Sequence, residues 1–433
     1  LDSLYAVAES IEKKLVTKST YFSELDKLFK ADWKDIQNKL GKNDVVIEFI
    51  CFKPDTLCIK KDREENLYCA LVLKKDQKYP EMIELCSEIQ LQQLLQGYKN
   101  TESEKINSLY NDDKLYNLIL KPILKNIKKG SNILYSPDGI LHRISFPAIS
   151  DNKGKQLCTQ YNLSLLSSSL SLLVNYSPVL KTDFNVLMFG AIDYSDTIGN
   201  AEIWEYLPGT LTETEGIKNV LGNSRHKYLL KKDLDATESF VRDSASHYTI
   251  THFATHGFYF PDHELLQNAM QTDTIESGEI EFRSNKKSNG RTSFVESKNP
   301  LMRAGLAMSS ANTVWSIFEN INQDDGVLTA FELSMINLLQ TKLVVLSACE
   351  TGLGEIYQNE GVFGMQRALK MAGVEFIIVS LWKVPDTETS EFMIYFYSEL
   401  IKSMNIRDAF NATQIHFQKI YGPYFWGAFQ LVE

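Results

Sequence analysis

The chain has 433 residues, of which 44% are hydrophobic and 11% aromatic, enough for roughly two to four globular domains with well-filled cores. Its formal charge of −10 at pH 7 disfavours nonspecific binding to nucleic acid, whose phosphates attract basic surfaces, but does not exclude a local basic patch. No apolar run approaches the roughly 18 to 20 residues needed to cross a bilayer. We therefore expect a soluble, cytoplasmic chain with no direct role in a membrane.

The first residue is Leu1, and no basic stretch followed by an apolar segment and a cleavage site comes after it, so we expect a fragment of a longer protein. The six cysteines are Cys51, Cys58, Cys69, Cys86, Cys158 and Cys349. They form no CxxC motif and no Cys/His cluster at zinc spacing, which disfavours a structural metal. Scattered thiols in a chain of this length are typical of reduced cysteines in a cytosolic protein.

Residues 1–42 are polar and rich in lysine and glutamate, with apolar residues at helical spacing. They predict one or two helices that lead into the first domain or end an upstream helical array. The pattern then predicts strands at 45–50, 56–59, 67–73 and 133–136, and helices at about 78–98 and 104–128. Residues 43–180 are therefore expected to form one α/β unit, which has no obvious catalytic constellation.

From residue 181 to the end, the predicted elements alternate more regularly between strand and helix. Strands are predicted at 186–189, 227–230, 248–254, 343–348, 374–381 and 426–432, and helices at 210–221, 236–245, 328–339, 361–371 and 387–401. Thr212 and Glu215 have the spacing of a capping box for the first of these helices. The order predicts a mostly parallel six-stranded sheet covered by helices. A polar segment at about 262–300 interrupts the pattern and predicts a mobile lid or a disordered insertion.

Two candidate catalytic residues follow neighbouring strands of this predicted sheet. His256 comes just after the third strand and Cys349 just after the fourth. Because catalytic groups in open α/β sheets lie at the carboxyl ends of strands, we expect these side chains to meet. His256 would then take the proton of the Cys349 thiol during attack on a carbonyl carbon. The amides of Gly257 and Cys349 are the candidate donors to the developing oxyanion.

Other interpretations of these residues stay open at this point. A free cysteine is often a small buried hydrophobe, although Cys349 at a strand end, before a turn, favours exposure. His252 lies inside the third strand, where we expect a hydrogen-bonded core residue or one that supports the site residues from behind. Glu350 and Glu360 could line the site or belong to a solvated face. Cys51 and His142, a possible pair in the first half, lack a neighbouring glycine turn and are interpreted as structural.

Four motifs along the chain together resemble the CHAT domain, a caspase-like and separase-related family of cysteine peptidases often found behind TPR repeats. They are Ala254-Thr255-His256-Gly257, Leu346-Ser347-Ala348-Cys349-Glu350-Thr351-Gly352, Glu360-Gly361-Val362-Phe363-Gly364 with Arg367-Ala368, and Ser380-Leu381-Trp382-Lys383-Val384-Pro385-Asp386. Shorter stretches also resemble the family, and with them the resemblance runs from about residue 43 to the end. They are Pro137-Asp138-Gly139 with Phe146-Pro147-Ala148, Leu207-Pro208-Gly209 and Pro423-Tyr424-Phe425-Trp426-Gly427-Ala428-Phe429. The 262–300 segment shows little of the family pattern.

The resemblance implies a caspase-like, six-stranded, mostly parallel sheet in residues 181–433, with His256 and Cys349 as the catalytic dyad. It implies that residues 43–180 are a degenerate, inactive copy of the same α/β fold. Residues 1–42 would be the end of an upstream TPR region that recruits substrate or receives a signal. Family members act as thiol proteases in programmed cell death and bacterial defence, and some are activated by a partner.

Asp386 lies 37 residues after Cys349 and directly before a predicted helix, which resembles the position of the separase aspartate that binds a basic P1 residue. A carboxylate there would pair with arginine or lysine and repel acidic side chains. Alternatively, Asp386 could cap the helix by accepting a hydrogen bond from the N–H of Thr389. One residue could serve both purposes.

The sequence thus predicts a cysteine endopeptidase that cleaves a protein or peptide substrate after a basic residue. This chemistry requires no metal and no organic cofactor. A catalytically silent regulatory or scaffold module is the alternative from another class. An acyl-transferring cysteine enzyme is disfavoured because no glycine loop that could cradle the phosphates of a CoA-like group is visible.

Overall fold

The structure is a computed structural model, and it describes most of the chain. The described residues are 28, 30–54, 65–97, 101–174, 176–195, 204–261, 297–312, 324–348, 351–352, 354–357 and 361–433. Cys58, Cys349, Glu350 and Glu360 lie outside these ranges, as do the predicted strand at 56–59, nearly all of 1–29 and most of the 262–300 segment.

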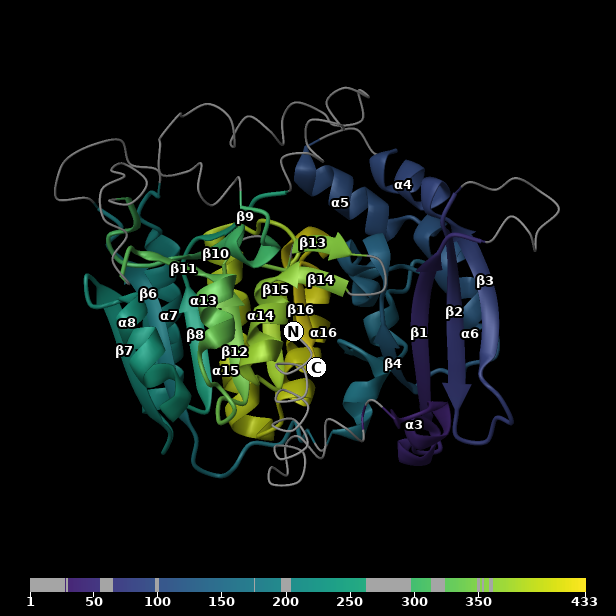
Figure 1. Ribbon diagram of the computed structural model, residues 1–433, viewed down its shortest axis with the longest axis horizontal. Coiled ribbons are helices and arrows are strands. Elements are labelled where there is room, and N and C mark those ends of the chain that lie inside the picture. The colour runs from purple at the N-terminus through teal and green to yellow at the C-terminus, as the bar shows by residue number, and fades with distance from the viewer. Residues whose placement is uncertain are drawn as a thin grey trace, which may run out of the picture.

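One eleven-stranded sheet extends through the whole molecule, in the order β3-β2-β1-β4-β5-β16-β15-β12-β8-β6-β7 (Figure 1). The first half supplies β1 (Asp44–Phe52), β2 (Leu67–Lys74), β3 (Glu81–Ser87), β4 (Asn132–Ser136) and β5 (Asn162–Leu165). The second half supplies β6 (Asn185–Ile192), β7 (Lys227–Asp233), β8 (Ile250–Ala254), β12 (Leu343–Ser347), β15 (Phe376–Ser380) and β16 (Phe429–Val432). These last six strands correspond to the six that the sequence predicts.

The sheet is mostly parallel, because its only antiparallel pairs among the described strands are β1 with β2, β2 with β3, and β15 with β16. The central strands β8, β12 and β15 are buried along their whole length, which is what a parallel sheet covered on both faces requires. The halves join where Leu165 of β5 pairs with Val432 of β16. The predicted fold class, a mostly parallel α/β sheet with flanking helices, is confirmed.

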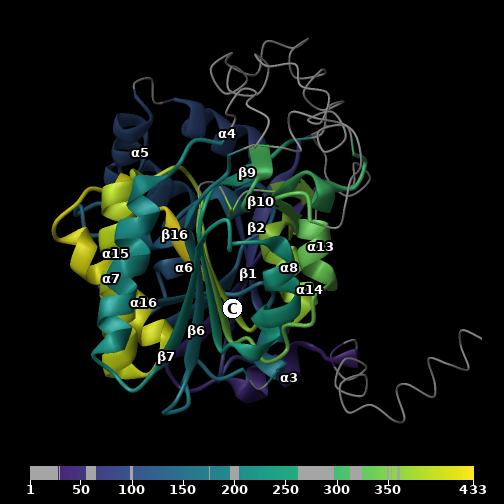
Figure 2. The same ribbon diagram turned by 90° about the vertical axis from the view of Figure 1, so that its left-hand side faces the viewer.

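Helices cover both faces of the sheet (Figure 2). In the second half, one face carries α7 (Pro208–Gly222), α15 (Asp386–Ser403) and α16 (Ile406–Gln418), and the other carries α8 (Glu238–Ser244), α13 (Ala330–Met335) and α14 (Met365–Ala372). The first half contains α3 (Trp33–Lys39), α4 (Glu88–Gln96), α5 (Glu102–Asn111), a π-helical turn η1 (Tyr116–Leu120) and α6 (Lys121–Leu124). A last short helix, α17 (Pro423–Trp426), precedes β16.

Two small antiparallel sheets lie beyond the carboxyl ends of β8 and β12, at the top of Figure 1. One consists of β9 (Gly257–Tyr259), β10 (Ala304–Ala307) and β11 (Val327–Thr329), and the other of β13 (Gly354–Tyr357) and β14 (Gly361–Gly364). The sequence predicts none of these strands. Since β9 begins one residue after His256, the first small sheet borders the candidate site.

Several local predictions are wrong. The stretch predicted as a helix from about 78 begins with strand β3, and the helix predicted from 361 begins only at Met365, after β14. The capping box of Thr212 and Glu215 is absent, because α7 begins at Pro208 with no side-chain cap, and Glu215 instead pairs with Lys218 at 2.7 Å. Proline at the first helical position favours this early start, because its fixed φ suits a helix and its missing N–H would have no partner within the helix.

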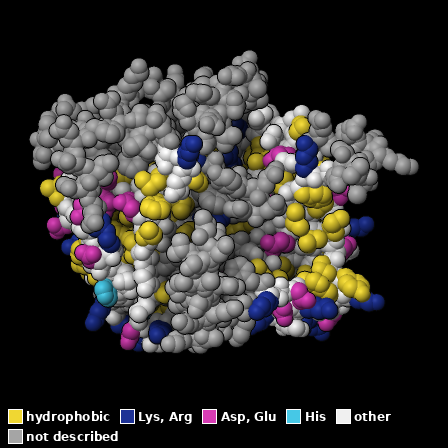
Figure 3. All heavy atoms as spheres, in the orientation of Figure 1, with side chains coloured by type: hydrophobic (Ala, Val, Ile, Leu, Met, Phe, Trp, Pro, Cys, Tyr) yellow, Lys and Arg dark blue, Asp and Glu magenta, His cyan; other side chains and the backbone are white. Residues whose placement is uncertain are grey.

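The surface in Figure 3 carries interspersed acidic and basic side chains. Over α13 on this face, hydrophobic side chains gather, including Phe331 and Met335, which are 38% and 73% exposed. Within the described ranges, no helix has the length and apolar character needed to span a membrane.

Candidate active site

The candidate site lies at the carboxyl ends of β8 and β12, which are parallel neighbours in the sheet. Their register pairs Ala254 with Ser347, and His256 and Cys349 each follow two residues later in the sequence. Cys349 and Glu350 are outside the described residues, so the structure describes only the residues on either side of them. The sequence position of the cysteine relative to this register matches that of the histidine.

Both flanks of residues 349–350 are tied to the end of β15. The carbonyl oxygen of Ala348 accepts hydrogen bonds from the hydroxyl of Ser380 at 2.7 Å and from that of Thr351 at 3.2 Å. The amide of Gly352 donates to the carbonyl oxygen of Ser380 at 2.7 Å. The backbone is therefore hydrogen-bonded to the end of β15 both before and after residues 349–350.

The imidazole of His256 is oriented by a main-chain carbonyl. Its Nε2 atom lies 2.7 Å from the carbonyl oxygen of Glu205. A carbonyl oxygen can only accept, so Nε2 must carry the hydrogen, and in the neutral ring Nδ1 keeps its lone pair. His256 therefore presents Nδ1 as the atom that can accept a proton.

The surroundings of His256 favour the neutral ring. The rings of Tyr194 and Trp204 each have their centroid 5.1 Å from that of the imidazole. Burial lowers the pKa of His256 below its usual value, the hydrogen bond to Glu205 opposes this shift, and the nearby ammonium of Lys383 adds to it. A neutral imidazole at physiological pH is a proton acceptor, as a general base must be.

Buried hydrogen bonds hold the segments around His256 in place. The hydroxyl of Thr255 donates to the carbonyl oxygen of Ala307 at 2.6 Å and lies 2.7 Å from the Tyr194 hydroxyl. Asn312 accepts from the amide of Trp204 at 2.8 Å and donates to its carbonyl oxygen at 3.0 Å. Asn312 thus fixes the backbone immediately before Glu205. Tyr194, Trp204 and Asn312 belong to none of the quoted sequence motifs, so their contacts around His256 were not predicted.

Gly257 is the first residue of β9 and pairs with Leu306 of β10. It is partly exposed beside His256. Its predicted role as an oxyanion donor stays a prediction, as does that of the Cys349 amide.

His252 is fully buried inside the strand β8 and lies against two helices, α7 and α15. Its Nε2 lies 2.9 Å from a carboxylate oxygen of Glu213 on α7, and its Nδ1 lies 3.3 Å from the hydroxyl of Tyr397 on α15. Since the histidine and the glutamate are 0% and 2% exposed, the pair is sequestered from water. His252 therefore links the sheet to the helical layer, and a supporting role for it stays a prediction.

Asp386 is exposed and is the first residue of α15. The N-cap is Pro385, no side chain caps the helix, and the Thr389 amide donates to the carbonyl oxygen of Pro385 at 3.1 Å. The capping interpretation of Asp386 is therefore wrong. Gly209 of α7 lies so close that a Cβ atom there would overlap the Asp386 side chain. The carboxylate is near enough to His256 and Tyr194 to affect the pKa of each.

Cys51 and His142 in the first half lack the properties of a reactive pair. Burial raises the pKa of the Cys51 thiol to about 11, so the thiolate is scarce at neutral pH. Burial lowers the pKa of His142 to about 4. These values agree with the structural roles expected for both residues.

Comparison with known proteins identifies relatives of the sequence and of the fold. The model of the CHAT domain family matches residues 113–433. Tetratricopeptide repeat protein 28 of Mus musculus is 35% identical over 78 residues, which are 18% of this chain and 3% of that protein. The chain therefore spans only a small part of this relative's length.

Two crystal structures of the Saccharomyces cerevisiae separase-securin complex resemble the fold, each with a TM-score of 0.50. Their sequence identities are 10% and 9%, and the matches cover 95% and 96% of this chain but 31% and 32% of the separase-complex chains. At this identity the likeness concerns the fold alone, which this chain shares with the aligned part of those chains.

Proposed function

The chain belongs to the CHAT domain family, and on that basis we propose that it is a cysteine endopeptidase with Cys349 as nucleophile and His256 as general base. The observation that carries the proposal is the orientation of His256. The Glu205 carbonyl accepts the hydrogen on Nε2, so Nδ1 is left as the proton acceptor. His256 follows β8, and the neighbouring strand β12 precedes Cys349.

In the proposed reaction, Nδ1 of His256 takes the thiol proton of Cys349, and the thiolate forms a bond to the carbonyl carbon of the scissile peptide. The amides of Gly257 and Cys349 would stabilise the oxyanion. The imidazolium then gives its proton to the departing amine as the C–N bond breaks. A water molecule, deprotonated by Nδ1, hydrolyses the resulting thioester and releases the acid and the thiol.

Asp386 is the proposed determinant of a basic P1 residue. Its carboxylate is exposed near His256 and, among the described residues, has no ion pair or side-chain hydrogen bond. An uncommitted carboxylate beside the reacting groups can form a charge-assisted pair with a substrate arginine or lysine. This pairing would also disfavour acidic residues at the same position.

We further propose that the peptidase acts on a protein substrate in the cytoplasm, in programmed cell death or bacterial defence, after activation by a partner or an adjoining TPR region. The family and the short match to a tetratricopeptide repeat protein support an association with TPR repeats. Residues 43–180 would then be the inactive α/β copy beside the catalytic unit, residues 181–433.

The test is cleavage of a library of fluorogenic peptides that differ only at P1. The wild-type chain should cleave after arginine or lysine, Cys349→Ala should lose all activity while keeping its circular dichroism spectrum, and Asp386→Asn should lose mainly the preference for basic residues. Undiminished cleavage by Cys349→Ala would refute the assignment. Absence of cleavage by the wild type, even with a TPR region attached, would favour the silent scaffold alternative.

A further inference from the structure

Residues 381–385 connect β15 to α15, whose first residue is Asp386. The start of this segment is fixed, because the Leu381 amide donates to the carbonyl oxygen of Ala428 at 2.9 Å. Lys383 and Asp386 are exposed, whereas Trp382 between them and the sheet is only 8% exposed. Leu381 and Val384 are buried as well, each 4% exposed, so Trp382 is one of three side chains that anchor the segment.

The indole of Trp382 packs on a residue of the first half. Its ring is stacked on that of Tyr110, near the end of α5, with centroids 5.8 Å apart and an interplanar angle of 29°. Tyr110 is 2% exposed, and its hydroxyl accepts a hydrogen bond from the amide of Ser145 at 2.9 Å. The surface on which Trp382 rests is therefore itself rigidly placed.

A second connection runs from Trp382 to α5 through α17. The indole N–H donates to the carbonyl oxygen of Tyr424 at 2.8 Å, and the amide of Tyr424 donates to the side-chain oxygen of Asn107 at 3.0 Å. Asn107 and Tyr110 are three residues apart on α5, so they share one face of the helix. This face of α5 thus contacts the Trp382 ring directly and is linked to its N–H through Tyr424 of α17.

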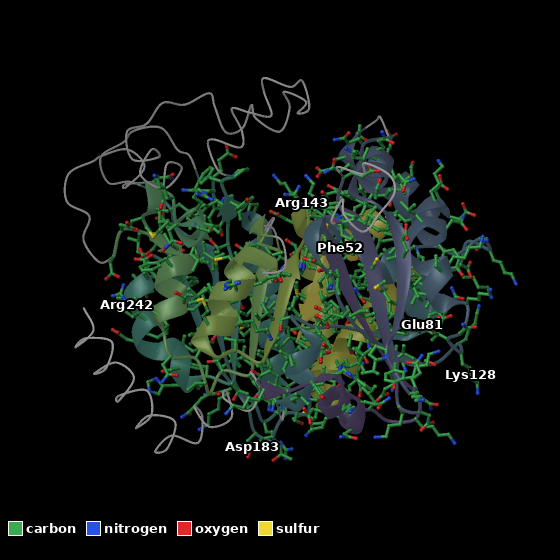
Figure 4. All side chains as sticks on the ribbon, turned by 45° about the vertical axis from the view of Figure 1, so that its right-hand side comes forward. Phe52, Glu81, Lys128, Arg143, Asp183 and Arg242 are labelled. Carbon is green, nitrogen blue, oxygen red and sulfur yellow. The ribbon has the colours of Figure 1, made fainter. Side chains whose placement is uncertain are left out.

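Other parts of the first half reach the same end of the sheet. The 3-10 helix η2 (Gly139–Arg143) contacts both β13 and β14, the strands that follow residues 349–350 in the chain. Figure 4 shows Arg143 and Phe52, the last residue of β1, at this end of the sheet, where the halves meet. The first half therefore borders the end of the sheet at which the candidate site lies.

We propose that α5 of the first half sets the position of Asp386 through Trp382, and so determines how strongly the site selects a basic P1 residue. The inference rests on the proposed function of Asp386. Tyr110, Asn107 and Trp382 act as positioning residues, because an arginine fork pairs well with a carboxylate only at a defined place and angle. A partner that shifts α5 would change the substrate preference without touching the dyad.

The experiment compares two peptides that are identical except for arginine or citrulline, its uncharged isostere, at P1. Tyr110→Leu removes the stacked ring, Tyr110→Phe retains it, and Asn107→Ala removes the second connection. Tyr135→Leu is the matched control, since Tyr135 is a first-half core ring that is 3% exposed and packs on Phe146. Hydrogen exchange of the 381–390 amides in the full chain provides a readout that requires no activity.

Tyr110→Leu should lower kcat/KM for the arginine peptide by about tenfold, mostly through KM, and leave the citrulline peptide within about twofold. Tyr110→Phe should retain the wild-type ratio, and exchange at 381–390 should rise in Tyr110→Leu but not in Tyr135→Leu. An unchanged ratio in Tyr110→Leu, or equal loss in Tyr135→Leu, would overturn the inference. A wild type without preference for arginine would overturn the role of Asp386, while the exchange comparison would still decide whether α5 holds the segment.

Discussion

Replacing Glu238 by Gln should remove a loss of stability that the wild-type chain suffers at alkaline pH. Glu238 is the first residue of α8 and is only 2% exposed. One carboxyl oxygen accepts a hydrogen bond from the amide of Gly326, and the other is buried near the carboxyl of Asp325. Burial, with repulsion from Asp325 and Glu332, raises the pKa of Glu238 from 4.5 to about 8.

The sign and size of the effect follow from this pKa. Between pH 4.5 and 8 the folded state keeps a proton that the unfolded state has lost, so stability falls as pH rises through the folded pKa near 8. At about 1.4 kcal/mol per pKa unit, Glu238 should cost the folded state about 1 kcal/mol between pH 7 and 9, and about 2 to 3 kcal/mol between pH 6 and 9.

The measurement is urea unfolding at pH 6, 7 and 9, followed by tryptophan fluorescence. Glu238→Gln should be more stable than the wild type at pH 7 by up to about 3 kcal/mol, because the unfolded wild type has already lost its proton above pH 4.5, and it should lose less stability than the wild type between pH 6 and 9. Glu215→Gln is the control, because that side chain is 38% exposed on α7. If Glu238→Gln and the wild type decline in parallel from pH 6 to 9, the carboxyl is not held protonated as described.

Three further predictions concern other described residues. Gly209→Ala should push the Asp386 side chain away and lower cleavage after arginine by about tenfold while sparing a citrulline peptide; equal loss on both peptides would contradict this. Asn312→Ala should release the backbone before Glu205 and reduce kcat by about 10- to 100-fold with little change in KM. The control is Asn185→Ala, which also removes a side-chain amide bonded to main-chain groups and should leave kcat unchanged. Burial lowers the pKa of His142 to about 4, so the unfolded state takes up a proton before the folded state does. The free energy of unfolding should therefore fall by about 2 kcal/mol from pH 7 to 5, and His142→Gln should reduce this fall in acid unfolding curves.

The central sheet could be predicted because its strands are continuous apolar runs. Leu343-Val344-Val345-Leu346 has the composition of a strand buried on both faces, and it forms β12. The positions of His256 and Cys349 after such runs led to the site without any knowledge of contacts. Where burial dictates composition, the sequence was informative.

The edge strand β3 was misassigned for the opposite reason. It is exposed along much of its length and contains Glu81, Met82 and Glu84, residue types that also suit helices. The strands β9, β10 and β11 have only three or four residues each, too few for a periodic signal. Their pairing depends on partners distant in the sequence.

The group that orients His256 could not be predicted at all. Glu205 acts through its main-chain carbonyl, which any residue could supply, so its side chain carries no information about this role. Its position depends on Asn312, which is 107 residues further along the chain. Likewise, nothing in the sequence indicates that Tyr110 stacks on Trp382.

The most direct test of the proposed peptidase is covalent labelling with an arginine chloromethylketone, followed by peptide mass spectrometry. We predict one label per chain, on the Cys349 sulfur, with labelling absent in Cys349→Ala and strongly slowed in His256→Ala and Asp386→Asn. Comparison with the labelling rates of a lysine chloromethylketone and an uncharged chloromethylketone measures how much the P1 charge contributes to the rate. Labelling of the partly exposed Cys158 in place of Cys349, or a rate unaffected by His256→Ala, would contradict the proposed dyad.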